Sequence, residues 1–147
     1  MTSIIKKLVS QKQAINSMIA LLTAVLVFHT LVLTGVISYA IVWGGKITIA
    51  ADMRKLEVIS ILVNTFSILI LLLKAGYIKN KISVKPLNAI ILLLAVLFSL
   101  NTIGNLFAES RFELYVFTPL TFISAVLCLR IVINKDFEEL NKKLSEQ

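Results

Sequence analysis

Residues 58–73 read VISILVNTFSILILLL and carry no charge between Glu57 and Lys74. Because a helix that crosses a bilayer needs about 20 mostly apolar residues, this run predicts a membrane span with the two charged side chains near its ends. Three further uncharged runs lie outward from it along the chain, at 13–45, 86–108 and 114–129. The whole chain of 147 residues is 58% hydrophobic and only 16% charged, which is typical of a protein whose solvent is the lipid bilayer.

The four runs predict an all-α integral membrane protein with four transmembrane helices, at about 17–43, 55–77, 86–107 and 114–134. The first run is too long for the apolar region of a signal peptide, so we expect it to be retained as a helix. Short connections make successive helices antiparallel neighbours, which predicts an up-down-up-down bundle. The expected organisation is a basic amphipathic segment at 1–16, a transmembrane domain at 17–134 and a charged cytoplasmic tail at 135–147.

Lysine and arginine are distributed unevenly between the two sides of this predicted bundle. Eleven of them lie at the two termini and around the 74–85 connection, and four lie on the other side: Lys46, Arg54, Lys55 and Arg111. Because cytoplasmic segments carry the excess of positive charge, both termini are expected in the cytoplasm. The net charge of +7 is thus explained by topology, without nucleic-acid binding. We expect the plasma (inner) membrane of a bacterium, with the basic N-terminus attracted to anionic lipid.

Polar residues gather in the outer half of the predicted bundle. In the second helix, Glu57, Ser60, Asn64 and Ser67 are spaced so that they share one face. Because polar groups inside a membrane need partners and often mark functional sites, the pattern predicts an outward-facing pocket closed below by apolar side chains. Its candidate ligand-binding residues are Glu57, Ser60, Asn64, Asn101, Asn105, Thr118, Thr121, Thr34 and Ser38.

A purely structural interpretation of these polar residues stays open. Serine, threonine and asparagine often hydrogen-bond between neighbouring membrane helices, at roughly 0.6 kcal/mol each. Glu57, Glu109 and Glu113 are the acids near the predicted mouth. At a membrane interface such acids are usually hydrated or paired with a nearby lysine or arginine.

Three single positions carry further hypotheses. His29, the only histidine, lies near the middle of the first span, and with Glu57 it is a candidate proton or ion relay. The predicted topology places no acid at its depth, which favours a neutral imidazole hydrogen-bonded across the bundle. Thr118-Pro119 either begins the regular part of the fourth helix or only kinks a continuous helix. Cys128 has no second cysteine to pair with, and we interpret it as a packing residue.

The sequence shows no nucleophile with a base, no metal-ligand cluster and no phosphate loop, so we predict no enzymatic activity, no cofactor and no metal site. The leading hypothesis is a small polytopic membrane protein, expected to be a homo-oligomer or to have a membrane-protein partner. Its pocket would bind a small polar ligand, a lipid headgroup or that partner. Two alternatives stay open: a homo-oligomeric channel or transporter with a path along Thr23, His29 and Thr30, and an accessory or scaffold subunit without a ligand site.

Overall fold

The computed structural model describes residues 9–42 and 49–133. Every regular element in these residues is helical: α2 (Gln11–Leu33), the short 3₁₀ helix η1 (Tyr39–Ile41), α3 (Ala50–Ala75), α4 (Val84–Leu106), the π-helical turn η3 (Glu113–Phe117) and α5 (Thr118–Val132). Four segments are long and apolar enough to cross a membrane, and η3 with α5 forms one of them. The predicted all-helical class with four apolar spans is confirmed. The predicted tail at 135–147 and residues 1–8 of the predicted N-terminal segment lie outside the described residues.

The first helix begins and ends earlier than the predicted 17–43, because α2 covers Gln11–Leu33. At its start Ser10 and Gln13 form a capping box: Ser10 Oγ accepts the Gln13 N–H at 3.2 Å, and Gln13 Oε1 accepts the Ser10 N–H at 2.9 Å. At its end Gly35 has φ 79°, a left-handed conformation that glycine adopts readily and that commonly ends helices. Residues 11–16, which were expected before the first span, therefore belong to the helix, and Tyr39 lies beyond it in η1.

The second and third helices follow the predicted ranges more closely. α3 begins at Ala50, five residues before the predicted 55, and ends at Ala75 before Gly76, which has φ 74°. α4 lies within two residues of the predicted range at its start, with Pro86 in its first turn as expected. The earlier start of α3 places Glu57 two turns inside the helix instead of at its end.

The fourth span is one continuous helix with a widened turn. Phe117 and Thr118 both keep right-handed helical backbone angles, and the Thr118 N–H bonds back to the Glu113 carbonyl. The regular α-helix α5 does begin at Thr118, but the chain before it is already helical, so Thr118 lies within a continuous, irregular helix and is not a free helix start. Pro119 has no N–H, and its ring would crowd a regular preceding turn. The π turn directly before Pro119 widens the helix there and relieves this crowding.

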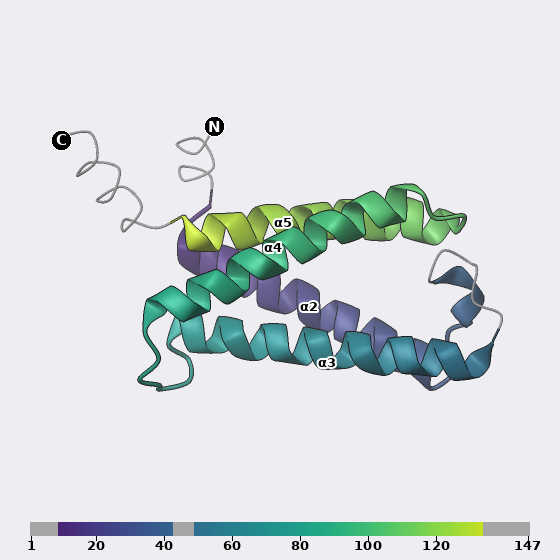
Figure 1. Cartoon of the computed structure of the whole chain (residues 1–147), viewed down its shortest axis with the longest axis horizontal. Coiled ribbons are helices and arrows are strands. Elements are labelled where there is room, and N and C mark those ends of the chain that lie inside the picture. Colours follow the sequence, from purple (N-terminus) through teal and green to yellow (C-terminus); the bar gives the residue numbers. More distant parts are fainter. Residues whose placement is uncertain (1–8, 43–48, 134–147) are drawn as a thin grey trace.

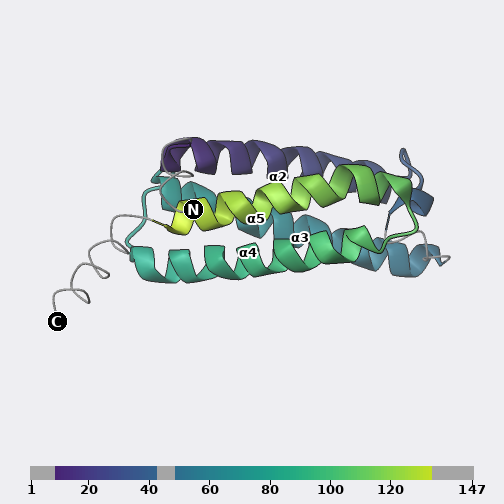
Figure 2. The same ribbon diagram turned by 90° about the horizontal axis from the view of Figure 1, so that it is seen from above.

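The helices lie lengthwise beside one another (Figures 1 and 2). The start of α2 meets the end of α5, where Gln11 Nε2 donates to the Ile131 carbonyl at 2.8 Å. The end of α3 meets the start of α4, where Lys74 Nζ donates to Asn88 Oδ1 at 2.6 Å. Figure 1 shows these four helix ends together at one end of the molecule, with residues 34–42 and the 107–112 connection at the other.

An apolar cluster fills the half of the bundle that contains the α3–α4 connection. It is built from all four helices and comprises Ala14, Ile15, Met18, Leu22, Ile70, Leu71, Leu87, Ile91, Leu94, Ala95, Phe98, Ala125, Cys128 and Ile131. Cys128 is fully buried within it, which confirms its interpretation as a packing residue. Beyond the cluster α2 stays packed on α3 and α4 on α5, whereas α3 and α4 pack against each other much less and diverge (Figure 1).

Candidate functional site

A cavity of about 280 Å³ lies between the four helices, next to the apolar cluster. Its polar lining comes from every span: His29 from α2, then Ser60, Asn64, Ser67, Asn101, Asn105, Glu113 and Thr121 from the others. The remaining lining is apolar: Leu21, Leu22, Val25, Val42, Ile59, Val63, Leu97, Phe98, Phe117 and Leu120. No lysine or arginine of the described residues lines it.

Five of the nine candidate residues proposed from the sequence line this cavity: Ser60, Asn64, Asn101, Asn105 and Thr121. Four do not line it. Thr34 is exposed and donates to the Thr30 carbonyl at 2.9 Å, because α2 ends at this point and the expected polar face does not continue. Ser38 is also exposed, beyond the helix end. Thr118 donates to the Glu113 carbonyl at 3.3 Å.

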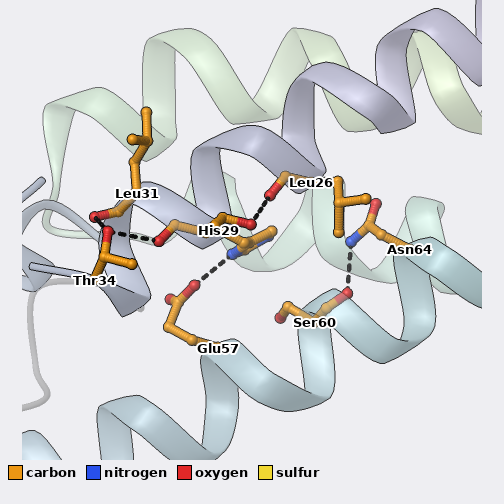
Figure 3. Close-up of polar contacts among 8 residues, drawn as sticks. Leu26, His29, Leu31, Thr34, Glu57, Ser60 and Asn64 are labelled. Atoms are coloured by element: carbon orange, nitrogen blue, oxygen red, sulfur yellow. Dashed lines mark hydrogen bonds and ion pairs between the residues drawn. The ribbon is translucent and has the colours of Figure 1, made fainter. Parts of the chain in front are cut away.

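Glu57, the fourth of these residues, does not line the cavity but contacts His29, which does. Its carboxylate is fully buried, and Glu57 Oε2 lies 2.7 Å from His29 Nδ1 (Figure 3). The expectation that no acid lies at the depth of His29 is wrong, because α3 starts earlier than predicted and brings Glu57 level with the last turns of α2. The expected hydrogen bond of His29 across the bundle is present, with Glu57 as its partner. Glu57 is therefore not an exposed, hydrated acid at the mouth.

On the α3 side of the cavity, two polar side chains donate hydrogen bonds to backbone carbonyls of their own helix. Asn64 Nδ2 donates to the Ser60 carbonyl at 2.8 Å (Figure 3), and Ser67 Oγ donates to the Val63 carbonyl at 2.7 Å. Both bonds satisfy a donor without joining two helices. The interhelical interpretation of these polar residues therefore does not describe Asn64 and Ser67, whose contacts leave them available as cavity lining.

On the α4–α5 side the polar residues do join two helices. Thr102 Oγ1 lies 2.9 Å from Thr121 Oγ1, and Asn105 Nδ2 approaches the same oxygen at 3.5 Å. Thr121 is 6% exposed and also donates within its own helix to the Phe117 carbonyl at 2.8 Å. Here the interhelical interpretation holds.

Glu113 was expected from the sequence to be an acid near the mouth, but the candidate ligand-binding residues included neither Glu113 nor a group of three phenylalanines beside it. Glu113 is 8% exposed and lines the cavity, so it is not an exposed, hydrated acid at the mouth. It begins the π turn, which no sequence spacing indicates in advance. The rings of Phe28, Phe112 and Phe117 lie 5.1–5.7 Å apart and fix α2 against this turn, and Phe28 also meets the His29 ring edge-on at 5.8 Å.

The site offers hydrogen bonds more readily than reactive groups. Within residues 9–42 and 49–133, no three histidine, cysteine or acidic side chains gather in a way that could hold a metal ion. Three carboxamides, three hydroxyls, one imidazole and one carboxyl group line the cavity, and together they can donate and accept hydrogen bonds from several directions. Comparison with protein-family models, curated proteins and solved structures finds no match for this chain.

Proposed function

We propose that this chain is a small integral membrane protein whose cavity binds one small molecule through hydrogen bonds. The observation that carries this proposal is the convergence of eight polar side chains from all four spans on one space of about 280 Å³. Sites for small molecules are concave and mostly apolar, with a few placed polar groups. Packing alone would favour filling such a space, since voids between membrane helices forfeit contacts.

In the membrane we propose an up-down-up-down bundle with both termini in the cytoplasm of a bacterium. The contacts that gather the start of α2, the end of α3, the start of α4 and the end of α5 support this. Lys79, Lys81 and Lys85 in and beside the α3–α4 connection then lie with the termini on the positive side. The cavity lies in the outer half under this orientation, and the apolar cluster closes it toward the cytoplasm.

The proposal is tested by whether a non-covalent molecule stays with the protein. We would release wild-type protein from mild-detergent micelles in a mass spectrometer and look for a retained mass. Asn101→Leu should lose it, because leucine removes a carboxamide from the lining. Ser99→Leu is the matched control, since Ser99 is also exposed on α4 but lies outside the cavity.

Asn64→Leu should also lose the retained molecule while the protein keeps its helical circular dichroism and its elution volume. A wild type that carries nothing, or equal retention in Asn101→Leu and Ser99→Leu, would contradict the proposal. The protein would then be an accessory or scaffold subunit whose polar residues only hold the bundle.

A second candidate function is transport of protons, which the buried His29–Glu57 contact beside the cavity favours. Histidine and acid chains inside membranes mark proton relays. The path first expected along Thr23, His29 and Thr30 needs revision, because Thr23 and Thr30 are exposed while His29 faces the bundle interior. If this function holds, the interior of vesicles that contain the protein should acidify when the outside is made more acidic, and Glu57→Gln should stop the acidification. Vesicles that stay impermeable to protons would exclude this function.

A further inference from the structure

The cavity reaches the molecular surface between α3 and α4. The lining residues that are exposed come only from these two helices: Ile59, Val63, Leu97 and Asn101. Lining residues of α2, η3 and α5 are buried or half-buried. The opening coincides with the place where α3 and α4 diverge beyond the apolar cluster (Figure 1). The mouth of the cavity is therefore on the side of the bundle.

The depth of this mouth decides what it faces. Ile59 and Val63 lie about 14 and 20 Å from the start of α3, and Leu97 about 14 Å from the end of α4, at 1.5 Å per residue. The hydrocarbon core of a bilayer is about 30 Å thick, within headgroup regions of several ångströms on either side. With the bundle placed in a bilayer as proposed, a mouth bordered by Ile59, Val63 and Leu97 faces acyl chains, not water.

The size and chemistry of the cavity limit its occupant. The cavity volume of about 280 Å³ lies just below the usual range for small-molecule sites, roughly 300–1,000 Å³, so it suits a small headgroup and the first carbons of a chain but not a whole phospholipid. No lysine or arginine of the described residues lines it, which disfavours a phosphate. Neutral hydroxyl or amide groups suit the carboxamides of Asn64, Asn101 and Asn105.

On the basis of the proposed function, we infer that the ligand is a neutral single-chain amphiphile that enters sideways from the bilayer. Its hydroxyl or amide headgroup lies against Asn64, Asn101 and Asn105. Its chain follows the apolar lining and leaves between Val63 and Leu97 into the acyl chains. An amphiphile of this kind keeps its tail in hydrocarbon while its headgroup exchanges lipid contacts for hydrogen bonds, which is favourable in an apolar surrounding.

Photolabelling in vesicles tests this inference. The full chain is placed in phosphatidylcholine vesicles with a monoacylglycerol that carries a diazirine near its headgroup, and the labelled residues are mapped by mass spectrometry. We expect labelling to concentrate on cavity residues such as Leu97 and Phe98. Excess unlabelled monoacylglycerol should compete for it, whereas glycerol, the same headgroup without a chain, should not.

A bulky residue at the mouth provides the matched comparison. Val63→Trp should lower cavity labelling about tenfold or more, the change that a loss of about 1.4 kcal/mol in affinity produces. Leu62→Trp is the control, because Leu62 directly precedes Val63 in α3, is 63% exposed and lies outside the lining. Equal labelling in the two variants would overturn the inference.

The outcomes separate this inference from the function on which it rests. If glycerol competes as well as monoacylglycerol, the ligand comes from water, and the sideways route is wrong while binding in the cavity stands. If labelling spreads evenly over the lipid-facing surface but a molecule is retained in the mass spectrometer, the amphiphile is wrong and the binding site stands. If labelling is even and nothing is retained, both are wrong.

Discussion

The His29–Glu57 contact joins α2 to α3 at the edge of the cavity, with the carboxylate fully buried. We expect the two residues to be energetically coupled by about 1 kcal/mol, because interhelical hydrogen bonds in membranes average about 0.6 kcal/mol and reach about 1.7 kcal/mol. A double-mutant cycle with His29→Leu and Glu57→Leu, read by equilibrium unfolding in mixed micelles, measures this coupling.

Thr30 supplies the control for that cycle. It lies next to His29 but its hydroxyl donates to the Leu26 carbonyl of its own helix at 2.8 Å. Thr30→Val combined with Glu57→Leu should therefore be additive within about 0.3–0.5 kcal/mol. Additivity in the His29 cycle as well would mean that the 2.7 Å contact contributes nothing to stability.

Thr121 tests the interhelical role of a polar residue on the other side of the cavity. Thr121→Val keeps the shape but removes the oxygen that Thr102 Oγ1 meets at 2.9 Å. We expect the free energy of unfolding to fall by about 1 kcal/mol, the usual net contribution of a buried hydrogen bond. Thr23→Val should cost less than about 0.5 kcal/mol, since Thr23 is exposed and bonds only the Ile19 carbonyl of its own helix. Equal losses would show that Thr102–Thr121 does not stabilise the bundle.

At the residue scale, the sequence predicted how far along the bundle a side chain lies better than which way the side chain points. Asn64, Asn101 and Asn105 lie on the cavity because counting residues from the charged ends of a span gives their depth, and helical spacing gives their face. Thr34 and Ser38 do not line the cavity, because the helix face to which they were assigned ends with α2, just before Gly35. The partner of His29 was missed since it depends on the start of α3, and an error of five residues in a helix start moves a side chain by about 7 Å along the axis.

At the scale of the element, two glycines end the first two long helices. Gly35 and Gly76 have φ 79° and 74°, and a Cβ at either would meet no atom within 4 Å. Gly35→Ala and Gly76→Ala should therefore each lower the free energy of unfolding by about 1 kcal/mol through backbone strain alone.

Gly104→Ala is the control, because Gly104 lies inside α4 with ordinary backbone angles and equal space around it. It should leave stability unchanged or raise it by up to about 1 kcal/mol. Unfolding in mixed micelles distinguishes these outcomes, and a neutral Gly35→Ala would contradict the assigned helix end.

The π turn η3 is the element that orients Glu113 toward the cavity. Pro119→Ala restores an N–H and removes the ring that disfavours a regular turn, so we expect the helix to regularise and to rotate Glu113 by about 100° for each residue of register lost. Retention of the bound molecule should then fall without a loss of thermal stability. Pro86→Ala, in the first turn of α4 and far from the cavity, should change neither. Unchanged retention in Pro119→Ala would show that the turn does not depend on the proline.

At the scale of the whole molecule, hydropathy alone predicted the class, because four uncharged runs admit few alternatives in a bilayer. It could not predict that α3 and α4 diverge, which depends on how side chains of all four helices pack at the apolar cluster. The polar residues indicated a pocket but not its mouth, since spacing along a helix says which side chains share a face and not how far apart two faces lie.

The orientation of the molecule depends on charges outside the helices. The α3–α4 connection carries Lys79 and Lys81, whereas the 107–112 connection carries Arg111 with Glu109 beside it. Since positively charged segments remain on the cytoplasmic side of a membrane, the two connections should lie on opposite sides. Ile82 and Phe107, which are 50% and 79% exposed, place one uncharged reporter position near each connection.

Cysteine labelling at these positions determines the orientation without altering a charge. Phe107→Cys in intact bacterial cells should react with a membrane-impermeant maleimide, because its connection is proposed to face outward. Ile82→Cys should react only after the membrane is permeabilised. The native chain provides the background, since Cys128 is fully buried among apolar side chains and should not react in either case. The reverse pattern would place the cavity in the cytoplasmic half of the membrane and the apolar cluster on the outer side, with every contact of the bundle unchanged.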